Sequence, residues 1–380
     1  MIESPWLTGL AALAALYWLV TVVRVGRGMA RVGFLREEPP VAGDEAPMVS
    51  VCVAARNEEG KVGAGVRSMA ELDYPILEVV AVDDRSEDCT GEILESLAAE
   101  HPCLRVLHLE QLPDGWLGKN HALHRAAAAA SGEVLLFTDA DAVLAPDALA
   151  RAVGILERDE LDHLAAAPDL EMPGPILRAF AGTFLITFTQ FAEPWKARDQ
   201  ESPRHVGVGA FNLVRRAAYR AAGGHRAIRL RPDDDLRLAR ALKAAGARAD
   251  VVYGTEMVRV PWYGTVREAV DGLSRSLWPG LDYSVAAAAG ALLVTLAFNV
   301  WPWFGVAVTA GPARWLGLAA VACSAGLFVA ASRYSSVRPW LAILWPVTGL
   351  LFAWIIVRST AGTLIRGGIE WRGTFYPLDR

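Results

Sequence analysis

The sequence predicts an α/β protein with a mostly parallel sheet, flanked at its N-terminal and C-terminal ends by transmembrane helices. Two observations lead to this prediction. Apolar segments of strand length alternate with segments of helical pattern between residues 49 and 157, and this alternation is typical of βαβ units. Four uncharged stretches also reach the roughly 17–25 residues that a helix needs to cross a bilayer, in a 380-residue chain that is 53% hydrophobic.

The uncharged stretches lie near the ends of the chain, at residues 6–23, 284–313, 315–332 and 339–357. Four arginines follow the first stretch, namely Arg24, Arg27, Arg31 and Arg36. Because short loops rich in basic residues stay in the cytoplasm, we expect a multi-pass protein of the cell (inner) membrane whose soluble part is cytoplasmic. Three further spans would place the C-terminal tail outside, whereas the arginines of that tail favour the cytoplasm. The number of C-terminal spans therefore stays open.

The soluble part alternates strands and helices in order. Strands are predicted at residues 49–54, 77–82, 104–109 and 134–138, and helices at residues 62–72, 90–99, 120–130 and 146–157. An apolar segment at residues 175–195 has too few uncharged residues to span a bilayer. Its phenylalanines share one helical face, which fits either a core helix or an amphipathic helix in the membrane plane. We expect an anchor at residues 1–26, a soluble domain at 45–281 and a membrane region at 282–380.

Charge and cysteine content exclude several classes of function. The net charge of −5 gives no support to a nucleic-acid partner. The cysteines show no CxxC or Cys/His spacing, so neither a zinc site nor a disulfide framework is indicated. No ionisable residue lies inside the uncharged stretches, which argues against a transporter.

Acidic residues follow two of the predicted strands. Asp83 and Asp84 come directly after the second strand, and Asp139 and Asp141 follow the fourth. Ligands of parallel sheets bind beyond the carboxyl ends of the strands, so we expect a shared site there. Side chains two residues apart on an extended segment point the same way, and two carboxylates held so close repel unless a cation lies between them. Mg²⁺ or Mn²⁺ carrying a diphosphate fits such ligands, and a solvated Asp-rich turn is the alternative.

Six motifs, taken in order, resemble the family-2 glycosyltransferases, which bind nucleotide sugars on a GT-A fold. They are VSVCVAARNEE (residues 49–59), with Ala54 in place of the usual proline, LEVVAVDDRSEDCT (77–90), LPDGWLGKNHAL (112–123), FTDADAVLAPDAL (137–149), GVGAFNLVRRAAYRAAGGH (207–225) and PDDDLRLARALKAAG (232–246). Together they cover nearly all of residues 49–246. The resemblance implies a GT-A fold and glycosyltransferase activity.

Carried over position by position, the resemblance implies a site for the sugar donor. Glu58 and Asp84 would contact the nucleoside. Asp139 would lie near the ribose and the metal, and Asp141 would ligate the Mg²⁺ or Mn²⁺ that bridges the two phosphates. Lys119 would approach the diphosphate, and a solvated helix start is the alternative for this lysine. Neighbouring positions of the same motifs are expected in the donor site as well, namely Ala54, Arg56, Asp83 and Ala140.

Sugar transfer also needs a base that takes the proton of the acceptor hydroxyl. Asp233, Asp234 and Asp235 crowd at a predicted helix start. The resemblance assigns the base to Asp235, with Asp234 as the alternative. Asp233 or Asp234 could equally do no more than cap the helix.

The acceptor is expected to be a lipid. The Q-x-x-R-W pattern of processive synthases is absent, which argues for transfer of a single sugar. The GWLGKNHAL, GGH and DDLRLAR segments are similar to bacterial members that glycosylate carotenoids or hopanoid-like lipids. The resemblance thus implies metal-dependent, inverting transfer of one hexose from a nucleotide sugar, a UDP-hexose, to a lipid acceptor. Two alternatives stay open: transfer to a polyprenyl phosphate, which Arg215, Arg216 and Arg220 would favour, and a non-catalytic nucleotide-sugar-binding subunit.

Overall fold

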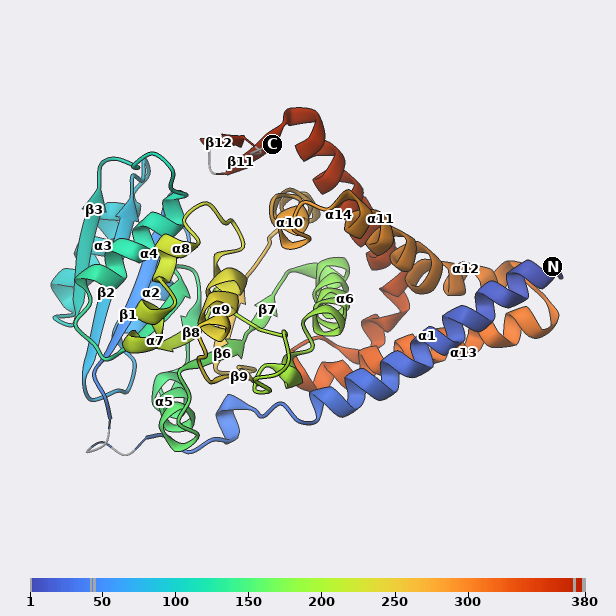
Figure 1. Ribbon diagram of the computed structural model, residues 1–380, viewed down its shortest axis with the longest axis horizontal. Coiled ribbons are helices and arrows are strands. Elements are labelled where there is room, and N and C mark those ends of the chain that lie inside the picture. Colours follow the sequence, from blue (N-terminus) through green and yellow to red (C-terminus); the bar gives the residue numbers. More distant parts are fainter. Residues whose placement is uncertain (1, 42, 44–45, 372–373, 378–380) are drawn as a thin grey trace. The chain divides into compact units, whose positions relative to one another are not determined.

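The computed structural model describes residues 2–41, 43, 46–371 and 374–377 (Figure 1). The chain forms two compact units. Unit 1 comprises Met1–Gly28, Glu171–Phe191 and Trp262–Arg380, and unit 2 comprises Met29–Leu170 and Ala192–Pro261. These units are divided at other residues than the predicted domains, whose boundaries stay a prediction.

Unit 2 is built on a seven-stranded sheet in the order β3-β2-β1-β4-β8-β6-β9. Its strands are β1 (Val49–Ala55), β2 (Leu77–Asp84), β3 (Leu104–Leu109), β4 (Val134–Asp139), β6 (His163–Ala167), β8 (Asn212–Arg215) and β9 (Ala249–Tyr253). The neighbours from β3 to β4 pair in parallel, as do β6 and β9. Strand β8 runs antiparallel to both β4 and β6. The prediction of a mostly parallel sheet is confirmed, with one antiparallel strand that was not predicted.

The helices of unit 2 follow the predicted alternation. They are α2 (Val62–Ala70), α3 (Thr90–Glu100), α4 (Gly118–Ala129), α5 (Ala148–Arg158), α7 (Arg216–Ala221), α8 (Gly224–Ala227) and α9 (Asp234–Ala244), with short 3₁₀ helices η1 (Leu35–Glu37) and η3 (Pro194–Lys196). A small sheet adds β5 (Val143–Leu144), β10 (Val258–Pro261) and β7 (Asp169–Glu171), in the order β5-β10-β7. Every strand and helix predicted for residues 49–157 is present, with ends that agree within two residues.

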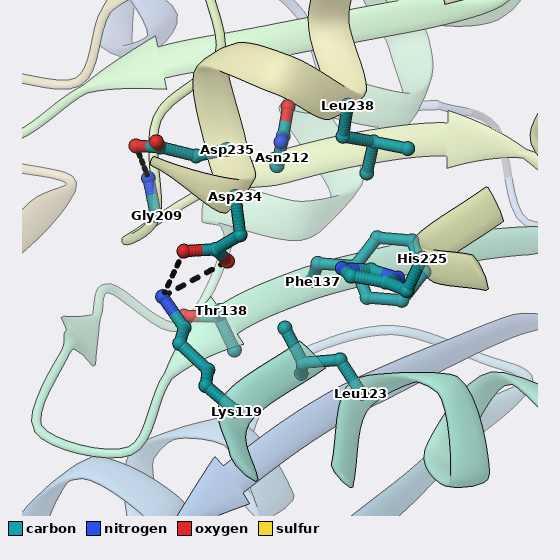
Figure 2. Close-up of a pocket in the computed structure, with 10 residues that line it drawn as sticks. All are labelled: Lys119, Leu123, Phe137, Thr138, Gly209, Asn212, His225, Asp234, Asp235 and Leu238. Atoms are coloured by element: carbon teal, nitrogen blue, oxygen red, sulfur yellow. Dashed lines mark hydrogen bonds and ion pairs between the residues drawn. The ribbon is translucent and has the colours of Figure 1, made fainter. Parts of the chain in front are cut away.

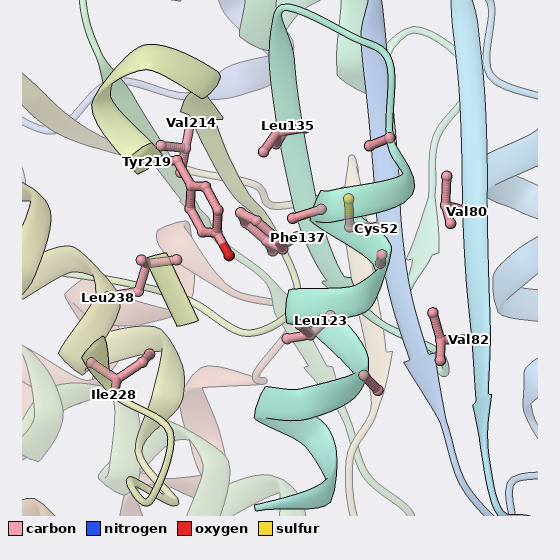
Figure 3. Close-up of a cluster of buried hydrophobic side chains, with 14 of the residues drawn as sticks. Cys52, Val80, Val82, Leu123, Leu135, Phe137, Val214, Tyr219, Ile228 and Leu238 are labelled. Carbon is pink, nitrogen blue, oxygen red and sulfur yellow. The ribbon is translucent and has the colours of Figure 1, made fainter. Parts of the chain in front are cut away.

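The core of unit 2 lies between the sheet and α4, which packs on β1 and β2. Figure 3 shows Leu123 of α4 beside Phe137 of β4 and the small side chains of Cys52 and Val80 on β1 and β2. Alanines on the same face of α4 let the helix approach the strands closely. Each large apolar side chain buried in this way contributes about 1.5–3 kcal/mol. The packing fixes the start of α4, and with it Lys119, over the carboxyl end of the sheet.

Unit 1 is helical and strongly apolar. It contains α1 (Pro5–Met29), α6 (Gly174–Ala192), α10 (Val266–Gly280), α11 (Val285–Val294), the π-helical η4 (Thr295–Val300), α12 (Trp301–Val308), α13 (Gly311–Ala331), η5 (Ser332–Tyr334), η6 (Pro339–Leu344), α14 (Trp345–Arg366) and a hairpin of β11 (Gly368–Trp371) and β12 (Thr374–Pro377). Four helical segments are long and apolar enough to cross a membrane: Pro5–Met29, Val285–Val308, Gly311–Tyr334 and Pro339–Arg366. Among the described residues, every exposed large hydrophobic side chain except Ile76 and Leu230 belongs to unit 1.

Helix α6 belongs to the core of unit 1. Thr183 hydrogen-bonds through its hydroxyl to Thr348 of α14 at 2.7 Å. The ring of Phe180 is buried and lies 6.5 Å from the ring of Phe352, also on α14. Of the aromatic face predicted for this helix, Phe191 is the exposed ring, at 55%. The structure therefore favours the core-helix interpretation of this segment.

Candidate active site

The strand ends that carry the predicted acids lie side by side. The parallel register sets Ala54 opposite Asp139 and Ala55 opposite Asp83, so β1, β2 and β4 all end at one edge of the sheet. The chain order reverses between β1 and β4, with β2 and β3 on one side of β1 and β4 on the other. Such a reversal leaves a crevice at the carboxyl ends where ligands of α/β sheets bind. The expectation that these strand ends meet is confirmed.

Lys119 joins two acids that are far apart in the sequence. Its ammonium lies 2.9 Å from Asp139 Oδ1, at the end of β4, and 3.1 Å from Asp234 Oδ2, at the start of α9. Figure 2 shows Lys119 reaching from α4 to Asp234. Burial alone would lower the pKa of Lys119, but Asp139, Asp234 and Asp235 outweigh it and raise that pKa. The lysine is thus held charged, as the bridge between the β4 and α9 motifs.

Asp235 lies next to this bridge without sharing it. Its Oδ2 accepts the backbone N–H of Gly209 at 2.9 Å (Figure 2). Its Oδ1 accepts the N–H of Leu236 at 2.7 Å. Burial, followed by the Asp234 carboxylate, raises the pKa of Asp235 to about 7. Burial also raises the pKa of Asp234, against the opposing effect of Lys119. A carboxylate with a pKa near neutrality is suited to general acid–base chemistry.

Asp233 has a different environment from its two neighbours. Arg231 donates to both of its oxygens, at 3.0 and 3.2 Å, and Arg237 donates to Oδ2 at 2.7 Å. Asp233 occupies the N-cap position of α9, but its side chain makes no capping hydrogen bond. The expectation that Asp233 could cap the helix is therefore wrong, because two guanidinium groups take up its carboxylate.

Two glycines bring the loop before β8 against these acids. A Cβ atom on Gly207 would lie 2.0 Å from the backbone oxygen of Asp235, and one on Gly209 would lie 2.7 Å from Asp139 Oδ2. A side chain at position 207 would collide with backbone, and one at position 209 would force the Asp139 carboxylate to shift. The GVG sequence of this loop therefore allows α9 and the end of β4 to share one site.

Asp141 forms an ion pair with a second lysine, Lys61, which was not predicted from the sequence. Lys61 Nζ lies 3.3 Å from Asp141 Oδ2 and donates to the carbonyl oxygen of Pro261 at 2.7 Å. Burial, followed by the charge of Asp139, raises the pKa of Asp141, while Lys61 opposes the rise. In the sequence, Lys61 follows acidic residues and is typical of a solvated lysine at the start of a helix. Its partners are 80 and 200 residues away in the chain, so no local signal could have revealed them.

The acids at the end of β2 are held by neighbouring groups. Arg85 donates to both oxygens of Asp84, at 2.8 and 3.0 Å. Asp83 accepts the N–H of Ser86 at 3.2 Å on one oxygen and faces His108 Nδ1 at 3.0 Å with the other. Asp83 is therefore engaged in shaping the loop after β2, whereas the buried carboxylate of Asp84 is held by Arg85.

The remaining predicted donor residues lie at the end of β1, in the loop after it, and in the turn after β4. Ala54 and Arg56 are half-buried, as is Glu58, whose N–H donates to Thr90 Oγ1 at 2.7 Å. Ala140 is buried between Asp139 and Asp141. Asn57 adopts a positive φ of 53°, a conformation that is costly for a non-glycine residue and often marks a functional loop. The predicted donor residues thus line one stretch of the carboxyl edge.

The donor set of this edge fits a hard divalent cation. Asp141 is surrounded by the charges of Asp139 and Glu58, with Lys61 as the opposing cation. Within the residues that the structure describes, no group of three or more His, Cys, Asp and Glu side chains could enclose a metal. Carboxylate oxygens in excess of cations suit Mg²⁺ or Mn²⁺, which commonly take one or two carboxylates and complete their shell with substrate phosphates. The two carboxylates of FTDAD therefore fit the expected metal as a partial ligand set.

A small pocket lies beside the Lys119 bridge. Its polar lining includes Asn212 of β8 and His225 of α8, and Leu123, Phe137 and Leu238 form its apolar wall (Figure 2). Asn212 Oδ1 faces Nε2 of the buried His163 on β6. Burial lowers the pKa of His163 to about 4, so the ring is neutral. This pair was not found from the sequence, because its two residues gain their significance only from the β6–β8 pairing.

Two of the three arginines considered for a phosphate acceptor lie at the opposite end of the sheet. Arg215 pairs with Val134, the first residue of β4, whereas Asp139 is the last. Five residues of strand separate the two ends, about 16 Å at the usual rise. Arg215 also donates to Glu157, and Arg216 donates to the carbonyl of Gly132. These two side chains therefore serve the structure around the amino end of β4.

Comparison with known proteins identifies the domain. Residues 50–223 match the sequence model of the family described as glycosyl transferase family 2. The chain contains a glycosyltransferase family 2 domain. A β-monoglucosyldiacylglycerol synthase from Trichormus variabilis is 38% identical over 117 residues, which are 30% of this chain and 25% of that protein. The chain thus matches only about a quarter of the length of that synthase. A 4,4'-diaponeurosporenoate glycosyltransferase from Staphylococcus aureus is 21% identical over 346 residues, covering 87% of this chain and 89% of that protein.

A solved structure supports the fold of this domain. A mannosyltransferase from Pyrobaculum calidifontis, in complex with GDP-Man and Mn²⁺, superposes with a TM-score of 0.57 at 21% identity. The comparison covers 93% of this chain and 98% of that one. The predicted GT-A fold, with its mostly parallel central sheet, is confirmed.

Proposed function

We propose that this glycosyltransferase is a membrane enzyme that transfers one hexose, with inversion, from a nucleotide sugar to a lipid acceptor. The donor is a UDP-hexose and the reaction depends on Mg²⁺ or Mn²⁺. The soluble domain faces the cytoplasm, and the apolar helices of unit 1 span the inner membrane.

One observation carries the proposal. Lys119 is within 3.1 Å of both Asp139 and Asp234, so a single ammonium ties the acid expected at the donor to the acids expected at the acceptor. Such a bridge puts groups for both halves of a transfer reaction at one edge of the sheet. A binding subunit without catalysis would have no need of a carboxylate such as Asp235, whose pKa is raised to about 7 by burial and by Asp234.

In the reaction the acceptor oxygen attacks the anomeric carbon of the donor from the side opposite the diphosphate. Asp235 takes the proton of the acceptor hydroxyl as the new carbon–oxygen bond forms. The bond from the anomeric carbon to the diphosphate oxygen breaks, and the nucleoside diphosphate leaves with that electron pair. Lys119 is a source of positive charge for the leaving phosphates. Gly209 orients Asp235 by donating its N–H to Oδ2 at 2.9 Å.

Asp139 and Asp141 would hold the divalent cation. When bound, the cation neutralises the negative charge of the departing diphosphate. The hard carboxylate oxygens of these residues suit Mg²⁺ and Mn²⁺ alike.

The lipid acceptor is supported by composition and by the names of the relatives. Four helical segments are long and apolar enough to cross a membrane, and the exposed apolar side chains concentrate in the unit that holds them. Both relatives described above are named for lipid or carotenoid acceptors. An acceptor that is itself phosphorylated has less support, because Arg215 pairs with the residue at the far end of β4.

The test is transfer of labelled sugar into extracted lipid. Membranes containing the protein are incubated with a panel of labelled nucleotide sugars and Mn²⁺, and the lipids are separated by chromatography. Asp235→Asn should lower transfer at least about 100-fold, the usual scale for loss of a general base, while binding of the nucleotide sugar is retained. Glu201→Gln, at an exposed position, is the matched control and should transfer normally. Label that never enters lipid with any donor would refute the lipid acceptor, and normal transfer by Asp235→Asn would refute the assignment of the base.

A further inference from the structure

The two carboxylates of FTDAD are each paired with a lysine. The whole chain has only four lysines. Lys119 contacts Asp139 at 2.9 Å and Lys61 contacts Asp141 at 3.3 Å. Half of the lysines in the protein thus neutralise the residues that are expected to bind a divalent cation. A divalent cation that binds these carboxylates therefore competes with the lysine ammonium groups for the same oxygens.

The two lysines differ in how firmly they are held. The Lys119 side chain is 28% exposed and its ammonium bridges two acids. Moving this ammonium away would break its ion pairs with both Asp139 and Asp234. Lys61 is 41% exposed, and its contact to Asp141 is longer than its 2.7 Å bond to the carbonyl of Pro261. An exposed ammonium on a four-carbon stem can move into water at little cost. Lys61 is therefore the more easily displaced of the two.

Lys61 and a divalent cation compete for Oδ2 of Asp141. An ammonium 3.3 Å from Oδ2 occupies the space in front of that oxygen, and a metal ion bound there would repel it as a like charge. In the metal-free protein, however, the ammonium is useful. Asp139 and Glu58 both act on Asp141 with negative charge, and Lys61 offsets their repulsion.

We propose that Lys61 is an exchangeable counter-ion that occupies Asp141 until a divalent cation displaces it. This inference rests on the metal site of the proposed function. Lys61 lowers the affinity of the site for the bare cation, because binding must first break the contact between Lys61 and Asp141. A cation that arrives with a diphosphate brings further ligands and overcomes this competition. The loop that leads from β1 to α2 is thereby coupled to the state of the FTDAD turn.

The first experiment measures Mn²⁺ binding to the full-length protein in detergent, without nucleotide, by electron paramagnetic resonance of free Mn²⁺. Lys61→Met should tighten binding about two- to fivefold, the scale of a partly exposed ion pair converted to an equilibrium constant. Lys61→Arg keeps the charge and should bind Mn²⁺ as weakly as the unaltered protein. Lys196→Met is the matched control, since Lys196 pairs instead with Glu193 at 3.1 Å, and its affinity should not change.

A second experiment begins with the unaltered sequence, so its main readout does not depend on a variant folding. Reductive methylation with ¹³C-formaldehyde labels the lysines and keeps their charge, and four lysines give a spectrum simple enough to assign. Adding Mg²⁺ should shift the Lys61 methyl signal toward that of a solvated lysine and leave the Lys196 signal in place. Asp141→Asn should abolish the shift, because both the lysine contact and the metal site depend on that carboxylate.

The outcomes separate this inference from the proposed function. Equal Mn²⁺ affinity in Lys61→Met and the unaltered protein, or weaker affinity in the variant, would overturn the inference, as would a Lys61 signal that ignores Mg²⁺. If Asp141→Asn bound Mn²⁺ as tightly as the unaltered protein, the metal site of the proposed function would itself be wrong. Loss of Mn²⁺ binding in Asp141→Asn together with unchanged affinity in Lys61→Met would leave the metal site standing and remove the role of Lys61.

Discussion

Replacing Lys119 with methionine keeps the length of the side chain and removes the ammonium between two carboxylates. Breaking a buried ion pair on one side costs about 3–5 kcal/mol, and an exposed pair is worth about 1 kcal/mol or less. Lys119 lies between these limits, since it is 28% exposed and its partners Asp139 and Asp234 are 36% and 9% exposed. We therefore expect Lys119→Met to lower the free energy of unfolding by about 2 kcal/mol.

The loss should depend on pH in a defined direction. Without the ammonium, the folded-state pKa of Asp234 rises further above its unfolded value, because burial already raises it and Lys119 no longer opposes the rise. A carboxyl group of that kind destabilises the fold when ionised, and the penalty disappears as pH falls through its folded pKa. The variant should therefore be closest to the unaltered protein near pH 5 and furthest from it near pH 8.

The assay is thermal unfolding of the detergent-solubilised protein, followed by tryptophan fluorescence at both pH values. A loss of about 2 kcal/mol corresponds to roughly 4–8 °C in Tm for a domain of this size. Lys196→Met is the control, because its partner Glu193 keeps Arg204 at 2.8 Å, and it should shift Tm by less than about 2 °C. Adding Asp234→Asn to Lys119→Met should restore part of the loss. A Lys119→Met variant that unfolds at the unaltered temperature at pH 8 would refute the ion-pair reasoning.

Three further predictions follow from the same edge of the sheet. The value of kcat/KM should fall as pH is lowered, with an apparent pKa of about 7, since Asp235 must be deprotonated to act as base. The residual activity of Asp235→Asn should not show this fall at acid pH. Glu95 and Asp83 raise the pKa of His108, so the imidazolium stabilises the fold below its ordinary pKa and this contribution is lost as pH rises through the raised value. His108→Gln should therefore lower Tm by at most about 2 °C at pH 6 and by less at pH 9, and an equal shift at both values would contradict it. Gly209→Ala should weaken binding of the nucleotide sugar with Mn²⁺ about tenfold, because the new Cβ would lie 2.7 Å from Asp139 Oδ2 and overpacking of this kind costs about 1–3 kcal/mol. The affinity is measured by calorimetry. An unchanged affinity would show that the carboxylate can move aside.

The first half of unit 2 could be predicted from its sequence because local pattern and tertiary structure agree there. Strands β1, β2 and β4 are largely apolar runs of the kind that a sheet buried on both faces requires, whereas β3, at the edge of the sheet, is LRVLHL and partly exposed. The acids at their ends could be expected to meet, since parallel strands present their carboxyl ends at one edge. The spacing of Asp139 and Asp141 was expected to point both side chains the same way along an extended segment, but β4 ends at Asp139 and Asp141 lies in the turn that follows, so their joint metal site stays a prediction.

The second half could not be predicted in this way because packing overrides local preference. Strand β6 has the sequence HLAAA, and alanine favours helices over strands. Its central residues are completely buried between β8 and β9, and this burial decides its conformation. Strand β8 is only four residues long, too short to give a periodic signal.

The roles of the three adjacent acids also needed the structure. Arg237 follows Asp233 by four residues, a helical spacing that favours an ion pair, so the engagement of Asp233 left a signal in the sequence. No such signal exists for Asp234 and Lys119, which are 115 residues apart. The difference between Asp234 and Asp235 arises from this one distant lysine.

The antiparallel pairing of β4 with β8 divides unit 2 in a way that matters for its evolution and engineering. The chain up to the turn after β4 brings Asp84, Asp139 and Asp141, and the chain from β8 onward brings Asp234 and Asp235. The two halves pair from Val134 opposite Arg215 to Phe137 opposite Asn212, and they meet again where Lys119 contacts Asp234. Recombination between homologous genes at the intervening segment would therefore have to preserve both the strand pairing and the lysine contact. Parent sequences that share both features are the ones to recombine.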